Sequence, residues 1–167
     1  MMKQLRVSGI CLGFLLLGAP LFPSTLSVMV VETGVDENAP RLDASSLWEG
    51  GLMDVCFDTG HIVTNAPILR LERNQIRTYP DEGFLDLGEA MESGVEYYIL
   101  AVLDYEFRPQ DDPSTYRPRS IALRFVRLAP RRVLFEVQYT GDPRSSLAEA
   151  SRQAKEAARV LLSHFEG

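Results

Sequence analysis

Residue types that carry common protein chemistries are scarce in this chain of 167 residues. Two cysteines and two histidines are too few for a closed zinc site or a disulfide framework. Basic residues number 17 against 23 acidic ones, a formal net charge of -6. Because a nucleic-acid-binding protein needs basic groups to replace the counterions of the phosphates, this balance excludes that class.

Sequence motifs of catalysis and nucleotide binding are missing as well. There is no G-x-S-x-G nucleophile elbow, no G-x-G-x-x-G fingerprint and no Walker A string. Neither His61 nor His164 stands beside a candidate nucleophile. We therefore expect a protein that is not an enzyme and has no cofactor. The composition, with 46% hydrophobic and 24% charged residues, is that of an ordinary globular domain.

The first 27 residues have the features of a secretory signal peptide. Lys3 and Arg6 form a basic start, and the uncharged run Val7 to Ala19 follows. Small residues then lead to Ser27, after which we predict cleavage; a cut after Ala19 is the alternative. The apolar run is shorter than the roughly 20 residues that a spanning helix needs, so we expect no retained transmembrane helix. The protein is thus predicted to be exported, either periplasmic or associated with the envelope.

Residues 28–167 predict one α/β (α+β) domain, a single mixed sheet of about five strands with helices packed on it. Alternating or continuous apolar runs predict its strands at Val28–Val31, Ile62–Thr64, Val95–Phe107, Ile121–Phe125 and Val133–Tyr139. Helices are predicted from a Ser46–Glu49 capping box to Gly60, from Gly83 to Ser93, and from a Ser146–Glu149 box onward. The order is β-α-β-α-β-β-β-α. We expect Gly50-Gly51 to bring the first helix close to the sheet, and Cys56 to be a buried, inert thiol.

A glycine-ended helix that leads into an apolar strand at Met91–Leu100, and the hairpin at Leu128–Val133, carry a resemblance. They resemble the small periplasmic domains of the CsgG, LpoB and TolB amino-terminal type. The resemblance implies a domain that binds proteins at or across the cell envelope and does not catalyse a reaction. This chain departs from those families in the arginine-containing stretch Ile68–Tyr79 and in having no lipobox cysteine, which puts membrane tethering in doubt.

One string matches a catalytic motif. Asp58-Thr59-Gly60 is the sequence that carries the catalytic carboxylate of aspartic proteases, in which two such loops share a proton. A single copy would need a homodimer. The competing interpretation, which we favour, is a helix that ends with Gly60 at its C′ position.

Three residues of the same region have side chains that bind divalent ions. Asp54, Asp58 and His61 are spaced at i, i+4 and i+7, and two carboxylates with an imidazole suit such an ion. A small-ligand or metal-binding module is therefore a further alternative. Solvated acids on a helix surface are the simpler interpretation, so we expect no metal.

Arginines gather locally in this acidic protein. If Ile68–Tyr79 is a helix rather than an irregular arm, its three arginines share one face. Arginine and tyrosine are also the residues that protein interfaces favour. The predicted contact residues for an envelope protein or a second copy, or for peripheral contact with lipid headgroups, are Arg70, Arg73, Arg77, Tyr79, Tyr116, Arg117 and Arg119. Scattered loop charge is the competing interpretation.

Overall fold

The computed structural model describes residues 23–76, 94–106 and 112–165. The predicted signal peptide up to residue 22 and the predicted helix 83–93 lie outside the described residues. No helix among those described is both long and apolar enough to cross a membrane.

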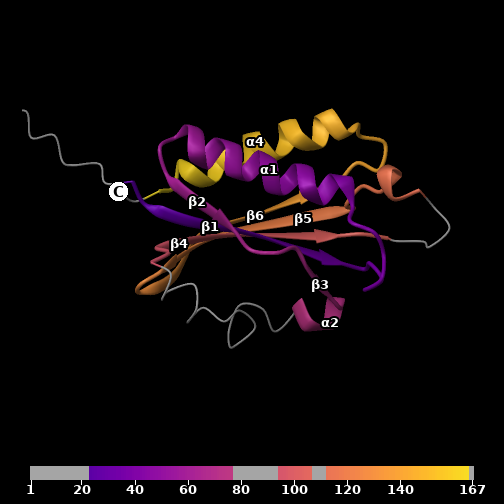
Figure 1. Ribbon diagram of the computed structural model, residues 1–167, viewed down its shortest axis with the longest axis horizontal. Coiled ribbons are helices and arrows are strands. Elements are labelled where there is room, and N and C mark those ends of the chain that lie inside the picture. The colour runs from indigo at the N-terminus through magenta and orange to yellow at the C-terminus, as the bar shows by residue number, and fades with distance from the viewer. Residues whose placement is uncertain (1–22, 77–93, 107–111, 166–167) are drawn as a thin grey trace, which may run out of the picture.

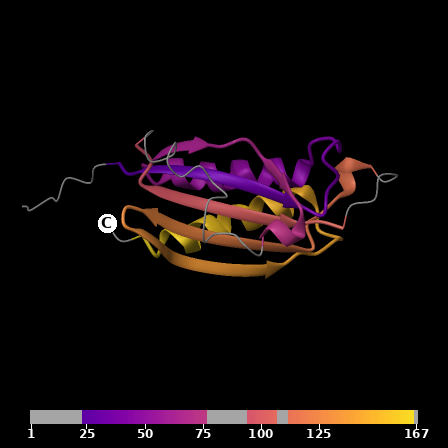
Figure 2. The ribbon, with the colours of Figure 1, turned by 90° about the horizontal axis from the view of Figure 1, so that it is seen from below.

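A single mixed sheet carries the fold, as predicted, and it has six strands where about five were expected (Figures 1 and 2). Its main path runs β2-β1-β4-β5-β6, with β3 also paired to β1. Strands β1, β2, β3 and β4 are parallel, whereas β5 is antiparallel to both β4 and β6. The strands are β1 Thr25–Thr33, β2 Ile62–Asn65, β3 Leu69–Leu71, β4 Tyr97–Asp104, β5 Ser120–Leu128 and β6 Arg131–Thr140.

Strand β1 extends beyond the predicted run Val28–Val31 at both ends, since it spans Thr25–Thr33. It lies between β2 and β3 on one side and β4 on the other, and every residue from Leu26 to Thr33 is buried. Burial on both faces explains why its sequence is continuously apolar rather than alternating.

Two long helices, α1 (Asp43–Asp58) and α4 (Leu147–Leu162), lie side by side on one face of the sheet (Figure 1). The capping box predicted for α4 is confirmed: the Ser146 hydroxyl accepts from the Glu149 amide, and Glu149 accepts from the Ser146 amide. The box predicted for α1 is wrong. That helix begins after Leu42, which has no side-chain cap, so Ser46 lies inside the first turns.

The paired glycines have a different role from the one expected. A Cβ at Gly51 would lie only 2.7 Å from the Cβ of Ala154, so the close approach is to α4 and not to the sheet. Gly50 has nothing within 4 Å of the corresponding position. The buried alanines of α4, among them Ala154 and Ala158, complete this contact between small side chains.

The stretch 68–79 is not one helix. Leu69–Leu71 forms β3 and Arg73–Ile76 forms the short helix α2, while residues 77–79 lie outside the described part. Arg70 and Arg73 therefore belong to different elements, and the predicted common helical face does not exist. Figure 1 shows α2 on the side of the sheet away from α1 and α4. A short 3-10 turn, η1 (Pro113–Thr115), precedes β5.

Candidate functional site

The arginines predicted to bind a partner lie near the carboxyl ends of β1 and β4, where they form internal contacts. Asp104 at the end of β4 accepts hydrogen bonds from Arg73 Nε at 2.6 Å and Arg119 Nε at 2.5 Å. It also accepts one from the hydroxyl of its register partner Thr33, at 2.8 Å. Burial alone would raise the pKa of Asp104, but these hydrogen bonds lower it overall. The network joins α2 and β5 to the ends of two central strands.

Arg70 is also held within the chain. Its Nε donates to Glu32 Oε2 at 2.8 Å, and its side chain is only 19% exposed. The terminal nitrogens donate to backbone carbonyls of the loop after β1, including Glu37 at 3.0 Å and Pro40 at 2.8 Å. Arg70 therefore fastens this loop to the edge of the sheet.

The other four predicted contact residues differ in where the structure places them. Tyr116 is 7% exposed and packs in the core, so the expectation of a surface contact is wrong for this side chain. Arg117 donates to the carbonyl of Ser145 at 2.8 Å and so ties η1 to the start of α4. Arg77 and Tyr79 lie outside the described residues.

The aspartic-protease alternative does not match the local structure. Asp58 is the last residue of α1 and is exposed, whereas that chemistry needs the carboxylate on a tight loop between strands. Gly60 has φ +88°, as predicted for the glycine that ends a helix. The interpretation of this string as a helix end is confirmed.

The metal-site alternative is not supported either. Within the described ranges, no group of three His, Cys, Asp or Glu side chains is placed to hold an ion. Asp54 instead pairs with Lys155 of α4 at 2.9 Å, and the ring of His61 packs 4.8 Å from that of Phe165. Nearby, Cys56 is buried, and this raises the pKa of its thiol to about 12. A thiol with that pKa is not a nucleophile near neutral pH, as predicted.

The opposite end of the sheet has features that the sequence patterns did not single out. Here β1, β4 and β6 begin, and α1 and α4 both end, because each helix runs antiparallel to these strands. Aromatic contacts place the end of α4 over the start of β4: the rings of Phe165 and Tyr97 are 4.7 Å apart, and those of Phe135 and His164 are 4.0 Å apart.

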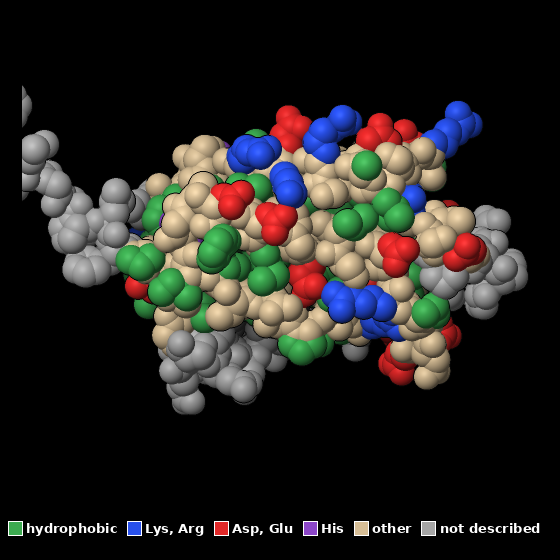
Figure 3. Space-filling model, turned by 45° about the horizontal axis from the view of Figure 1, so that its top comes forward, with side chains coloured by type: hydrophobic (Ala, Val, Ile, Leu, Met, Phe, Trp, Pro, Cys, Tyr) green, Lys and Arg blue, Asp and Glu red, His purple; other side chains and the backbone are tan. Residues whose placement is uncertain are grey.

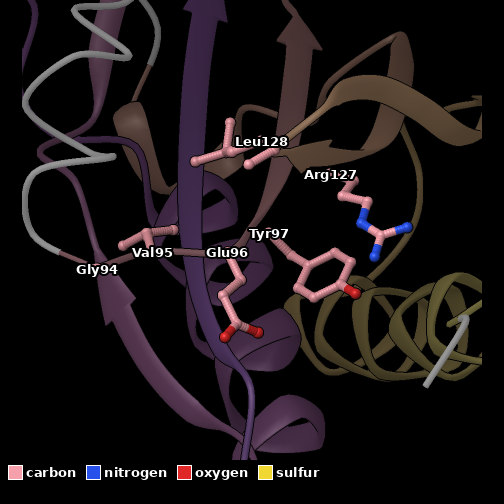
Figure 4. Close-up of a pocket in the computed structure, with 7 residues that line it drawn as sticks. Gly94, Val95, Glu96, Tyr97, Arg127 and Leu128 are labelled. Carbon is pink, nitrogen blue, oxygen red and sulfur yellow. The ribbon is translucent and has the colours of Figure 1, made fainter.

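An open groove of about 450 Å³ lies at this end, between the start of β4 and the end of β5 (Figure 4). Tyr97 and Arg127 are register partners, and Figure 4 shows their side chains next to each other on one side of the groove. The other register partner of Arg127 is Arg132 of β6. Like charges directly opposite each other on neighbouring strands are destabilising. No ion pair within the described part of the chain involves either arginine.

Exposed apolar side chains surround the same end. Among the described residues, the large hydrophobic side chains that are exposed are Phe57 (72%), Ile62 (52%), Val133 (42%) and Val160 (38%). They come from the last turns of α1 and α4 and from the first residues of β2 and β6. We call these four residues the amino-end surface. Figure 3 shows hydrophobic side chains grouped toward the left end of the helix-bearing face.

Comparison with known proteins yields structural likenesses only. No protein-family model matches the chain, and no curated protein matches it. A solved PelC dodecamer from Paraburkholderia phytofirmans matches 85% of this chain and 86% of its own, at 16% identity and a TM-score of 0.47. TolB from Acinetobacter baumannii matches 86% of this chain and 30% of its own, at 11% identity and a TM-score of 0.43. Lipoprotein GNA1162 from Neisseria meningitidis matches 84% and 99%, at 13% identity and a TM-score of 0.39.

These likenesses concern the fold. The match to TolB agrees with the resemblance predicted from the sequence, whereas the resemblance to CsgG and LpoB stays a prediction. The function is therefore argued from the residues of this chain.

Proposed function

We propose that this protein is an exported, non-catalytic domain that binds another protein of the cell envelope, or a second copy of itself, through the amino-end surface. The observation that carries the proposal is the location of its exposed apolar side chains. All four in the described residues lie at one end of the molecule, on four different elements. Ile62 and Val133 belong to the two opposite edge strands, so the four residues surround this end of the molecule and do not form one patch. Exposed apolar surface of this kind, gathered at one end, is a feature of interaction sites.

The composition of this end supports a protein partner. Arg127 and Arg132, which are register partners on β5 and β6, lie at the same end of the sheet as the exposed aromatic ring of Phe57. Aromatic residues and arginine are enriched at protein interfaces, and lysine is depleted. By contrast, the arginines at the carboxyl end are bonded to Asp104, Glu32 and backbone carbonyls. Docking at the amino end would leave these internal contacts intact.

Phe57 is expected to contribute most, because it is the largest and most exposed of the four. Full burial of such a side chain contributes about 1.5–3 kcal/mol. With 72% of it available for burial, the loss of Phe57 should weaken binding by about tenfold. Since the ring is exposed in the free protein, Phe57→Ser should leave the stability of the fold nearly unchanged.

Site-specific photo-crosslinking in intact cells tests the proposal. A benzophenone side chain is placed at position 57 or 133, with position 152 as the control, because Arg152 is exposed on α4 but outside the amino-end surface. We expect one discrete adduct from positions 57 and 133, none from 152, and loss of the adduct at 133 in a Phe57→Ser background. Sedimentation of the purified protein distinguishes self-association from a different partner. Equal crosslinking at all three positions, together with turnover of a substrate, would overturn the proposal.

A further inference from the structure

Glu32 is a charged residue in the interior of the protein. It follows Leu26, Val28 and Val30 at alternate positions of β1, so its side chain points toward the helix-covered face. The residue is 0% exposed. Its Oε2 accepts from Arg70, but its Oε1 has no hydrogen-bond partner among the described residues. A buried carboxylate oxygen without a donor is costly and therefore needs an explanation.

Glu32 forms part of the wall of an open pocket of about 560 Å³. Its backbone lies within the sheet, between β3 and β4, so its buried side chain forms the floor of the pocket. A ligand therefore reaches Oε1 only when the side chains that cover it move aside. The pocket lies between α1, the loop after β1 and the segment that joins β2 to β3. Asn65 pairs with Val28 and Leu69 with Val31, so this joining segment has one residue more than β1 between the same pairs.

The pocket is lined by more acidic than basic side chains. Its lining includes three carboxylates, Glu32, Glu37 and Glu49, and two guanidinium groups, Arg41 and Arg70. Arg41 binds Glu49 at 2.8 Å, while Arg70 binds Glu32. One formal negative charge therefore has no basic counterpart in the lining.

The remaining lining residues are apolar. Beyond Asn65, which donates to Glu49 Oε1 at 3.1 Å, the wall consists of Ala39, Pro67, Ile68 and Leu69. A ligand that fits this wall has an apolar stem and a positively charged group that donates hydrogen bonds at its end.

We propose that this pocket binds an alkylammonium group, with the ammonium donating to Oε1 of Glu32 and the alkyl stem packed along Pro67 and Ile68. A guanidinium ligand fits less well, because its planar fork needs two carboxylate oxygens and Arg70 already occupies Oε2 of Glu32. An ammonium is a compact charge with three rotatable donors, and one free oxygen suffices for it. The ammonium is carried either by a free alkylamine or by a lysine side chain of another protein.

The test titrates the full-length protein with two probes of the same charge, followed by calorimetry and by the amide NMR signals of Glu32 and Arg70. The probes are n-butylammonium, which donates three hydrogen bonds, and n-butyltrimethylammonium, which donates none. We expect saturable binding of the first probe, with shifts at both amides, and none of the second. The comparison is made on the unmodified protein, so it does not depend on any variant folding.

Two variants and two further ligands complete the experiment. Glu32→Gln should weaken butylammonium binding about 10- to 100-fold, the size expected for one hydrogen bond to a charged group. Glu156→Gln is the matched control, since Glu156 is exposed on α4 and does not line the pocket. A short peptide with one lysine is compared with butylammonium, and tighter binding of either identifies the source of the ammonium. Absent binding, equal binding of the quaternary probe, or displacement of butylammonium by micromolar Mg²⁺ or Ca²⁺ would overturn the proposal.

Discussion

The paired glycines of α1 allow helix propensity to be separated from packing. Gly50 and Gly51 are neighbours in the same helix, so alanine at either position should gain the same intrinsic propensity, about 0.8–1 kcal/mol. Only the Gly51 position is crowded: a Cβ there would lie 2.7 Å from the Cβ of Ala154 and 3.2 Å from the carbonyl oxygen of Ser151. Gly50→Ala should therefore raise the free energy of unfolding by about 1 kcal/mol.

Gly51→Ala should behave differently. Overpacking of a close helix contact costs about 1–3 kcal/mol, which equals or exceeds the gain in propensity. Urea unfolding at neutral pH measures the free energy of unfolding of both variants, and we expect Gly51→Ala to be about 1–3 kcal/mol less stable than Gly50→Ala. A double-mutant cycle with Ala154→Gly isolates the contact, because removing that methyl group makes room for the new one. Equal stabilisation by the two alanines, with no coupling to position 154, would refute the reasoning.

Three other predictions concern the charge network, the thiol and export. Asp104→Asn should destabilise the fold by about 1–2 kcal/mol at pH 7, since it weakens hydrogen bonds donated by arginines that are half exposed. Because folding lowers the pKa of Asp104, the stabilisation exists above the unfolded pKa of about 4 and is lost as the pH falls through the folded value. The difference in urea midpoint between the two proteins should therefore narrow below about pH 4, and a constant difference would contradict this. Cys56 should resist alkylation at pH 8 and react once urea unfolds the chain; fast modification of the native protein would show that the thiol is accessible. Cleavage after Ser27, the site predicted from the sequence, would remove the first three residues of β1, including the fully buried Leu26. We therefore now expect the alternative cut, after Ala19. Intact mass spectrometry of the exported protein decides between the two sites.

Elements with a strong local pattern were predictable from the sequence. The apolar run of β1, the β5–β6 hairpin and the capped helix α4 all have patterns that are complete within a short segment. A central strand that is buried on both faces needs apolar side chains on both faces, so its sequence is continuously apolar. In a capping box, the side chains of the two residues accept hydrogen bonds from each other's backbone amides, so no distant residue is needed. The order of elements followed from these patterns.

Glu49 shows where such local reasoning fails. The Ser46–Glu49 spacing matches a capping box, but α1 starts at Asp43, and Glu49 is nearly buried between Arg41 and Asn65. A serine three residues before a glutamate fits a capping box at the start of a helix, and it fits equally well two positions within the first turns of a helix. The partner that decides between them, Asn65, is 16 residues away and reaches Glu49 only through the tertiary fold.

The sequence by itself determined the class of fold, the order of its elements and the absence of common catalytic motifs, because these depend on local periodicity and residue type. It also identified the arginines at positions 70, 73, 117 and 119, but not their contacts. Only the tertiary structure decided that these arginines bond within the chain, and that the exposed apolar residues of four elements lie at the same end of the sheet. Residues distant in sequence become neighbours through strand pairing and helix packing, which no short segment encodes. For the same reason, the missing hydrogen-bond partner of Glu32 Oε1 could be recognised only from the tertiary structure, in which β3 and α1 contribute to the pocket around Glu32.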